Sequence, residues 1–478
     1  MDPKALKEKF RPVFYPRSIA VVGAANDDRK FGTRYLQALV TAGYQGKLYA
    51  INPYETGVLG LPTYPTVRDI PEPVEYVIMA VPKRLAPAIF DDCAARGVKI
   101  VQMFTAGFRE TGRDEDRRLE DELVRKAREG GFRIVGPNCI GVYSPANRMP
   151  YGMGATLREA GTVGFISQSG GHAGRMVDTG FSRGIRFSKV VSFGNGADLD
   201  SVDYLEYLAV DEETRIIGAY LEGVRQGQRF LHLLKEICPR KPVIIWKGGR
   251  TPSGAQVASS HTGSLATPDA LWRAALRQAG ALGVESLEEM ADTLLAFQDL
   301  GQVKGNRVAV VAGITGGGGG DSVFAADAFI SQGLQVPPLS PDTRAQLQEM
   351  LPPAGAIVRN PVDMGGSGGN LQTFIRVLTL VAADPQIDIM VLSENVPGLL
   401  RDLSWESINA LNTRLLRFKE GQPKPLVVVS PPGEADAERR EIERKLSEGG
   451  IPVFPAMERA ARALGNLVLY QSYRQERG

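Results

Sequence analysis

A chain of 478 residues is too long for one hydrophobic core and predicts about three domains. The 43% hydrophobic and 23% charged residues are ordinary for a globular protein, and a formal net charge of +2 gives no reason to expect nucleic acid or an anionic membrane as a partner. No apolar run approaches the roughly 20 residues that span a bilayer, and the N-terminus has no secretory signal.

The first 150 residues alternate apolar strands with amphipathic helices. Strands are predicted at 18–24, 47–52, 75–82, 98–108 and 132–142. Helices are predicted between them at 33–42, 85–97 and 117–131. Such alternation is typical of parallel β-α-β units, so we expect a doubly wound, Rossmann-like sheet whose ligands bind at the carboxyl ends of the strands.

Two further α/β units are predicted at 151–300 and 301–478. In each, a strand enters a glycine turn, a later helix leads to a strand that ends in Glu222 or Glu394, and a Lys-Pro step precedes another apolar strand. This shared order indicates a duplicated flavodoxin-like fold. The expected architecture is therefore a Rossmann-like domain at 1–150 followed by two flavodoxin-like α/β domains.

The turn after the first strand argues against one common class of nucleotide-binding protein. Gly23-Ala24-Ala25 is followed by its next glycine only at Gly32, which departs from the tight G-x-G-x-x-G of dinucleotide sites. The second strand ends in Asn52, where a nicotinamide-binding domain usually places an acidic residue. Both departures disfavour a nicotinamide oxidoreductase. On these residues alone, a turn needed only for chain reversal remains an alternative.

Five motifs together resemble the CoA-binding domain of the succinyl-CoA synthetase α-subunit and of the ADP-forming acetate–CoA ligases. They are PRSIAVVGAA (16–25), INP (51–53), AVPK (80–83), TAGF (105–108) and GPNCIGV (136–142), of which the last is the most specific. The resemblance implies CoA contacts at Gly23, Ala24, Asn52, Val81, Pro82, Ala106, Gly107 and Asn138. Pro82 and Gly107 could instead only shape turns.

Two further residues within these motifs complete the predicted CoA site. Ala25 stands where relatives often carry serine, so backbone N–H groups are expected to bind phosphate in place of the hydroxyl. Lys83 is an additional candidate for a CoA phosphate because of its charge.

Histidine is scarce: the sequence has only His172, His232 and His261. His261 lies in Ser-Ser-His-Thr-Gly-Ser (259–264), which we predict to be an exposed polar loop ahead of a helix. Taken alone, it could be a surface histidine without a task. The segment resembles the phosphohistidine loop of the same family, which implies that His261 is the catalytic histidine and that Glu222 fixes its tautomer. His232 is expected to pack or to lie on the surface.

Phosphate needs oriented N–H donors, and two glycine turns that open predicted helices could supply them. They are Ser169, Gly170 and Gly171 in the second unit, and Gly318, Gly319 and Gly320 in the third. In the family, two such helices from related domains face one phosphohistidine. His172 also lies at a helix start, and we interpret it as a local substitution within that motif.

The resemblance implies one subunit of an acyl-CoA synthetase: acid + CoA + ATP = acyl-CoA + ADP + phosphate, through an acyl phosphate and phospho-His261. No ATP-grasp segment is recognisable, so ATP and Mg would bind to an ATP-grasp β-subunit, in a heterotetramer. A non-catalytic CoA-binding regulator or scaffold is the alternative. Cys93, Cys139 and Cys238 form no disulfide framework or metal-ligand pair, so we expect a cytoplasmic protein without a metal site.

Overall fold

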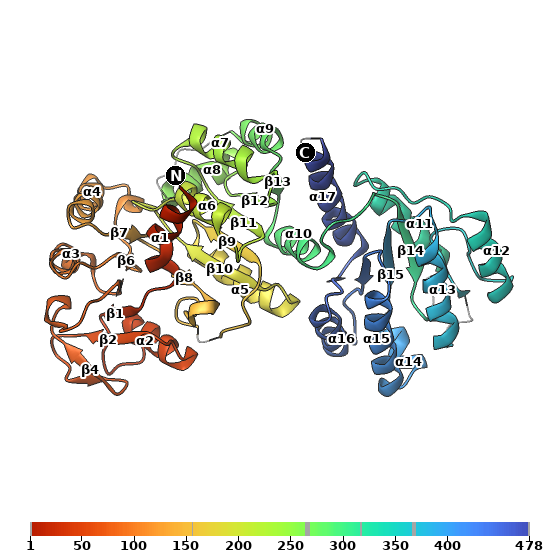
Figure 1. The fold of residues 1–478 in the computed structure, drawn as a ribbon, viewed down its shortest axis with the longest axis horizontal. Helices are drawn as coiled ribbons and strands as arrows, with labels where there is room; N and C mark the ends of the chain where they lie inside the picture. Colours follow the sequence, from red (N-terminus) through yellow and green to blue (C-terminus); the bar gives the residue numbers. More distant parts are fainter. Residues whose placement is uncertain (1, 155, 263–267, 316–317, 366–369, 477–478) are drawn as a thin grey trace. The chain divides into compact units, whose positions relative to one another are not determined.

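The computed structural model describes residues 2–154, 156–262, 268–315, 318–365 and 370–476. The chain divides into two compact units (Figure 1). Unit 1 comprises Met1–Phe181 and Arg186–Leu287, and unit 2 comprises Ser182–Ile185 and Glu288–Gly478. Both units are α/β with predominantly parallel sheets, which confirms the predicted fold class. Boundaries at residues 150 and 300 stay a prediction.

The first sheet of unit 1 has seven strands in the order β3-β4-β2-β1-β5-β6-β7. They are β1 Ser18–Val22, β2 Lys47–Ile51, β3 Gly57–Val58, β4 Leu61–Tyr64, β5 Tyr76–Met79, β6 Ile100–Met103 and β7 Arg133–Val135. All neighbours pair in parallel except β3 and β4. The strand order reverses between β1 and β5, which is where such sheets bind ligands.

Helices accompany this sheet along the chain. They are α1 Pro3–Phe14, α2 Phe31–Ala42, α3 Ala86–Ala95 and α4 Asp114–Glu129, with the short 3-10 helices η1 Val67–Asp69, η2 Lys83–Leu85 and η3 Arg109–Thr111. Residues of β1, β5 and β6 are buried along their whole length, because helices cover both faces of a doubly wound sheet. This explains why these strands read as uninterrupted apolar runs in the sequence.

The second sheet of unit 1 has the order β13-β12-β11-β9-β10-β8. Its strands are β8 Gly141–Tyr143, β9 Val163–Ser167, β10 Phe187–Ser192, β11 Ile216–Leu221, β12 Val243–Lys247 and β13 Leu282–Val284. Numbered along the chain, the parallel strands β9 to β13 follow the flavodoxin order 2-1-3-4-5. The helices are η4 Pro145–Asn147, α5 Gly170–Arg183, α6 Ser201–Val210, α7 Gly227–Ile237, α8 Pro252–Thr262 and α9 Asp269–Ala279.

The segment 132–142 corrects the single strand predicted there. It forms two strands in different sheets: β7 closes the first sheet, and β8 pairs antiparallel with β10 in the second. Gly136 and Asn138 both have positive φ, at 107° and 56°, so the chain turns sharply between the strands. The GPNCIGV motif therefore connects the two sheets.

Unit 2 has a parallel sheet in the order β14-β15-β16-β17. Its strands are β14 Val308–Ala312, β15 Ile389–Ser393, β16 Leu426–Val429 and β17 Val453–Phe454. Val362 makes an isolated parallel bridge to Val311, on the side of β14 where a flavodoxin sheet has its second strand. The helices are α10 Leu287–Leu300, α11 Gly318–Ile330, α12 Pro341–Met350, α13 Leu371–Ala383, α14 Val396–Asp402, α15 Trp405–Glu420, α16 Asp436–Glu448 and α17 Met457–Gln475.

Helix α13 illustrates how local sequence builds this unit. The side chain of Asn370 accepts hydrogen bonds from the backbone N–H groups of Gln372 and Thr373, at 3.0 and 3.2 Å, and so caps the helix. Phe374, Val377, Leu378 and Val381, spaced by three or four residues, lie on one face. That face packs into the core formed with alternate residues of β14 and β15. No helix in the described ranges is long and apolar enough to cross a membrane.

The strand register distinguishes the two glutamates that end strands in the two flavodoxin-like sheets. In unit 1 the last pair of β9 and β11 is Ser167 with Tyr220, so Glu222 lies two residues beyond that pair. In unit 2 the last pair of β14 and β15 is Ala312 with Ser393, so Glu394 lies one residue beyond. Because side chains alternate between faces, Glu394 takes the place of Leu221 rather than of Glu222. The two glutamates therefore share the end of a strand but do not occupy equivalent positions in the two sheets.

Candidate active site

A cavity of about 610 Å³ opens where the strand order of the first sheet reverses. It lies at the carboxyl ends of β1, β2 and β5, as expected for a doubly wound sheet. Among the residues predicted to contact CoA, its lining includes Gly23, Ala25, Asn52, Val81 and Pro82. The sequence prediction and the topology thus point to the same edge of the sheet.

Two glycines shape the turn between β1 and α2. Gly23 has a φ of 98°, and a Cβ there would lie 2.7 Å from the carbonyl oxygen of Ala80. A Cβ on Gly32, in the first turn of α2, would lie 2.4 Å from the carbonyl carbon of Gly23. Only glycines permit this close approach of helix and turn, which brings the start of α2 to the cavity.

Hydrogen bonds fix the rest of this turn. The carbonyl of the buried Ala24 accepts a bond of 2.7 Å from Asn52 Nδ2, which ties the first turn to the end of β2. The N–H of Ala25 donates to Thr33 Oγ1 at 2.9 Å. This bond holds the turn against α2, and binding of a CoA phosphate by backbone N–H groups of the turn stays a prediction.

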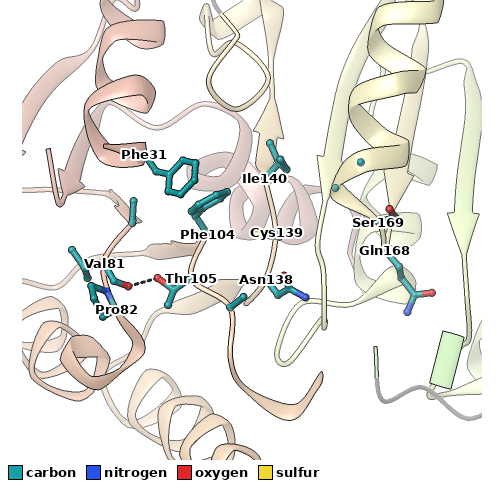
Figure 2. A pocket seen from close by; sticks show the side chains of 14 residues that line it. Phe31, Val81, Pro82, Phe104, Thr105, Asn138, Cys139, Ile140, Gln168 and Ser169 are labelled. Carbon is teal, nitrogen blue, oxygen red and sulfur yellow. Dashed lines mark hydrogen bonds between the residues drawn. The ribbon is translucent and has the colours of Figure 1, made fainter. Parts of the chain in front are cut away.

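A second cavity, of about 520 Å³, extends from the first sheet to the start of α5. Val81 and Pro82 line both cavities, and Figure 2 shows the second one passing Phe31 and Phe104 towards the loop at the start of α5. Its lining combines predicted CoA contacts with predicted phosphate contacts: Val81, Pro82, Ala106, Asn138, Ser169, Gly170 and Gly171. One continuous surface therefore joins the two predicted sites within unit 1.

The start of α5 has the geometry of an anion site. Ser169 Oγ accepts a hydrogen bond of 3.3 Å from the N–H of His172 and so caps the helix. The first-turn N–H groups of Gly170 and Gly171 have no partner within a helix, and both residues line the cavity. A Cβ on Gly170 would lie 2.7 Å from Ile140 Cγ1, so glycine is required for this close packing.

Lys83 and Gly107 do not contribute to the lining of either cavity. The Lys83 ammonium forms an ion pair with the buried Asp116 and donates to the Gly107 carbonyl at 2.7 Å. Gly107 has a φ of 99°, as a turn residue would. A direct contact of either residue with CoA stays a prediction.

Glu222 is held from two neighbouring strands. It is 6% exposed, and its backbone N–H donates to the side-chain oxygen of Gln168, which also accepts from the N–H of Gly223 at 3.0 Å. From β12, the Lys247 ammonium donates to the Glu222 carbonyl at 2.8 Å. These contacts fix the backbone on which the carboxylate is carried.

The carboxylate of Glu222 accepts a hydrogen bond of 3.2 Å from the hydroxyl of Tyr220. Burial, and next the nearby carboxylate, raise the pKa of Tyr220 above its ordinary value, so this hydroxyl stays a donor. Burial lowers the pKa of Lys247, whose ammonium is 5.7 Å from the ring centre of Trp272. The contacts of Gln168, Tyr220 and Lys247 with Glu222 were not predicted from the sequence, because they depend on which strands lie side by side in the sheet.

His172 belongs to an aromatic cluster beside Glu222. Its ring centre lies 4.5 Å from that of Tyr220 and 4.6 Å from that of Trp246. The imidazole thus packs on the residue that donates to Glu222, a position that the motif alone did not reveal. His232, by contrast, is largely exposed and lies 3.2 Å from Glu236 on α7.

His261 lies in the last turn of α8, which corrects the loop predicted at this place. The helix forms because Thr251 Oγ1 accepts from the N–H of Gly254 at 3.1 Å and Pro252 opens the first turn. Small residues that tolerate helix continue it to Thr262. The side chains of residues 259–262 are outside the described part, so the pairing of His261 with Glu222 stays a prediction.

Helix α8 lies against η3, the short helix that follows Ala106 and Gly107. The backbone that carries His261 therefore belongs to the same unit as both cavities and Glu222. The second predicted phosphate turn lies in unit 2, where α11 begins at Gly318 as expected. A phosphate role for Gly318, Gly319 and Gly320 stays a prediction.

Models of three protein families match consecutive parts of the chain. The CoA binding domain matches residues 17–145, the succinyl-CoA ligase like flavodoxin domain matches 160–297, and the ligase-CoA domain matches 310–477. With the fold and the cavities described above, they define a CoA ligase chain composed of a CoA-binding part and two ligase parts.

Comparisons with individual proteins narrow this class. The α-subunit of ADP-forming acetate–CoA ligase II of Pyrococcus furiosus is 37% identical, over 95% of this chain and 96% of that subunit. ADP-forming acetate–CoA ligase I of Archaeoglobus fulgidus is 36% identical, over 96% of this chain but 63% of its own length. A solved acetyl-coenzyme A synthetase of Ca. Korarchaeum cryptofilum, in complex with phosphate and ADP, superposes with a TM-score of 0.84 at 32% identity, covering 98% of this chain and 97% of that one.

The chain therefore belongs to the family of ADP-forming acetate–CoA ligase α-subunits, which confirms the resemblance that its motifs indicated. These relatives are ligases, so the catalytic interpretation is supported over a scaffold without activity. Their description as α-subunits implies a partner subunit.

Proposed function

We propose that this chain is the CoA-binding, histidine-phosphorylated subunit of an ADP-forming acyl-CoA synthetase. The observation that carries the proposal is the continuous lining from the CoA turn at Gly23, through Val81 and Asn138, to the start of α5 at Gly170. CoA bound over the first sheet could direct its thiol along this surface to a phosphate held at α5. The buried Glu222 lies in the same unit.

The proposed reaction has three balanced transfers. ATP phosphorylates His261 and leaves as ADP. The carboxylate of the acid then takes the phosphoryl group from phospho-His261, which gives an acyl phosphate and the free imidazole. Finally the CoA thiolate attacks the acyl carbon and releases phosphate, with the thiol proton passing to solvent or to a nearby base. Glu222 holds one ring nitrogen of His261, and the α5 N-terminus stabilises the phosphate oxygens.

The partner is proposed to be an ATP-grasp β-subunit that binds ATP and Mg, in a heterotetramer. Support comes from the ADP-forming acetate–CoA ligase I of Archaeoglobus fulgidus, of which this chain covers 63%, so that a part of this relative long enough for a further domain lies outside the match. A cytoplasmic location is proposed from the three free, buried cysteines, which a reducing compartment would maintain.

The decisive experiment is phosphorylation with radiolabelled ATP in the presence of the partner subunit. Wild type should give an acid-labile, base-stable phosphoprotein, and His261→Ala should lose the label by more than about 1000-fold while CoA binding stays within about twofold. His232→Ala is the matched control, because His232 is an exposed imidazole in the same unit.

Labelling that persists in His261→Ala would remove this residue from the mechanism. Labelling that disappears in His232→Ala as well would show that the assay does not report on one imidazole. CoA binding without any phosphorylation of wild type would leave only a thioester-carrier protein.

A further inference from the structure

The second cavity of unit 1 has one apolar wall, whose residues come from three separate segments of the chain. Phe31 opens α2, Phe104 follows β6, and Ile140 directly precedes β8. The ring centres of Phe31 and Phe104 are 4.8 Å apart, with the ring planes tilted by 53°. Figure 2 shows the two rings side by side, with Ile140 on the neighbouring segment. Because Phe31 is 49% exposed, this wall is open to a ligand in the cavity.

Tyr35 holds this wall in place from behind. It lies one helical turn after Phe31, so both rings are on the same face of α2. The buried ring of Tyr35 meets Phe104 edge to face, with ring centres 5.6 Å apart. Its hydroxyl donates to the carbonyl of Ile140 at 2.8 Å. The three segments are therefore fixed to one another by the protein itself, and the wall is preorganised for a ligand.

The apolar wall lies between the two ends of the proposed reaction path. On one side, Val81 and Pro82 line both this cavity and the proposed CoA cavity. On the other side, Ile140 packs on the start of α5, since a Cβ on Gly170 would lie 2.7 Å from Ile140 Cγ1. In the proposed acyl transfer, the acyl carbon lies between the CoA sulfur and a phosphate oxygen. The side chain attached to that carbon therefore meets the apolar wall.

The residues that line this cavity carry no charged side chain. Two of the polar ones are engaged within the protein. The Thr105 hydroxyl donates to the carbonyl of Val81 at 2.7 Å, and the side-chain oxygen of Gln168 accepts from the N–H of Gly223 at 3.0 Å. A second carboxylate on the substrate would lose its hydration here without gaining a cation. The cavity therefore favours an acid whose side chain is uncharged and apolar.

We propose that Phe31, Phe104 and Ile140 bind the side chain of the acid substrate, and that this substrate is a monocarboxylic acid with a bulky apolar side chain rather than a dicarboxylic acid. The inference rests on the proposed function and names its substrate class. The methyl group of an acetyl group would leave most of the wall exposed to water. A benzyl group would cover both rings and remove apolar surface from water on the ligand and on the protein.

The test is isothermal titration of the full-length chain with CoA, acetyl-CoA, phenylacetyl-CoA and succinyl-CoA, which needs neither ATP nor the partner. Wild type should bind phenylacetyl-CoA about 10-fold more tightly than acetyl-CoA, and succinyl-CoA no more tightly than acetyl-CoA. Phe104→Ala should reduce the preference for phenylacetyl-CoA to less than about threefold, while the affinity for CoA stays within about twofold. Phe31→Ala should do the same, and it removes a half-exposed ring that the fold does not need. Val40→Ala is the matched control, because Val40 is an exposed apolar residue of the same helix outside the cavity.

Equal affinities of wild type for acetyl-CoA and phenylacetyl-CoA would overturn the inference, as would tighter binding of succinyl-CoA than of either. A preference that survives in both Phe31→Ala and Phe104→Ala would also overturn it. So would an equal loss of affinity for CoA and phenylacetyl-CoA in these variants, because the rings would then contact the CoA arm instead of the acyl group. CoA that binds without any acyl preference rejects only this inference, whereas a chain that does not bind CoA rejects the proposed function as well.

Discussion

The two flavodoxin-like sheets carry a glutamate at the same edge and surround it in opposite ways. In unit 1 Glu222 is fixed by Gln168 and Lys247 through its backbone and by Tyr220 through its carboxylate. In unit 2 the Glu394 carboxyl has no side-chain partner among the described residues, and the backbone N–H groups of Asn395 and Ile314 are its neighbours. Glu222 is thus oriented by side chains of neighbouring strands, whereas burial raises the pKa of Glu394 above its ordinary value.

The two glutamates differ in their surroundings because the strand register differs, and because other residues stand in unit 2 where Gln168 and Lys247 stand in unit 1. Gln168 directly follows β9, and Gly313 directly follows β14, so an amide in one sheet corresponds to no side chain in the other. Lys247 pairs with Leu221, and Ser430 stands at the corresponding place beside Glu394. A one-residue slip in the strand ending thus changes both the face and the chemistry of a similarly placed carboxylate.

Among these predictions, we expect the largest effect when the Glu222 carboxyl group is replaced by an amide. Glu222→Gln keeps the shape and the backbone bonds but cannot stabilise a charged imidazole, so we expect phosphorylation of His261 to slow about 100-fold. Single-turnover labelling with ATP and the partner measures this rate. An unchanged rate, with the Glu222→Gln and Glu394→Gln variants behaving alike, would show that the two glutamates do not differ in role.

Lys247→Met should have the next largest effect. The change leaves the carbonyls of Glu222 and Gly248 buried without their donor, at a cost of about 2–3 kcal/mol in the free energy of unfolding. Urea denaturation measures it, with the exposed Lys99→Met as control. A loss no greater than in the control would mean that the ammonium does not hold the end of β11.

Tyr220→Phe sharpens the comparison by removing only the bond to the carboxylate. We expect a loss of about 1 kcal/mol, seen as a roughly fivefold slower phosphorylation with CoA affinity unchanged. The measurement is the labelling rate beside a CoA titration of the same sample. A fall in CoA affinity instead would assign Tyr220 to the architecture of the cavity.

The stability of Glu394→Gln should differ from that of wild type in a pH-dependent way, and in the stabilising direction. The folded-state pKa of about 8 lies above the ordinary value of 4.5, so between these values the folded protein keeps a proton that the unfolded chain has lost. Wild type therefore loses stability as the pH rises from 4.5 towards 8, and the loss levels off above 8. The variant has no such dependence. Thermal melts should favour the variant more at pH 9 than at pH 6, and parallel melting curves would contradict the raised pKa.

Most of the fold could be predicted because buried parallel strands read as uninterrupted apolar runs, as at β1 and β5. β8 could not, since the apolar run at 132–142 gives no sign that the chain leaves one sheet and enters another at Gly136. Helix α8 was missed because small polar residues near His261 are equally compatible with a loop, and the cap at Thr251 decides the matter.

Some residues of the candidate site could likewise be predicted from the sequence, and others could not. Val81, Asn138 and Gly170 were predicted from motifs, because turns that approach a ligand need particular residue types, and all three line the second cavity. Gln168 and Lys247 contact the backbone of Glu222 from neighbouring strands, so only the strand register reveals them. Glu394 was noted for its place at a strand end, but its lack of side-chain partners among the described residues depends on contacts that no local pattern encodes.

The antiparallel strand β8 belongs to the second sheet of unit 1 and follows directly on the segment that leaves the first sheet. It is continuous with the segment Asn138–Ile140 that lines the second cavity, and it is anchored to β10 by paired residues such as Val142 and Val191. Because the lining segment and β8 form one stretch of chain, a molecule that contacts the cavity at Asn138 also contacts the connection between the two sheets of unit 1.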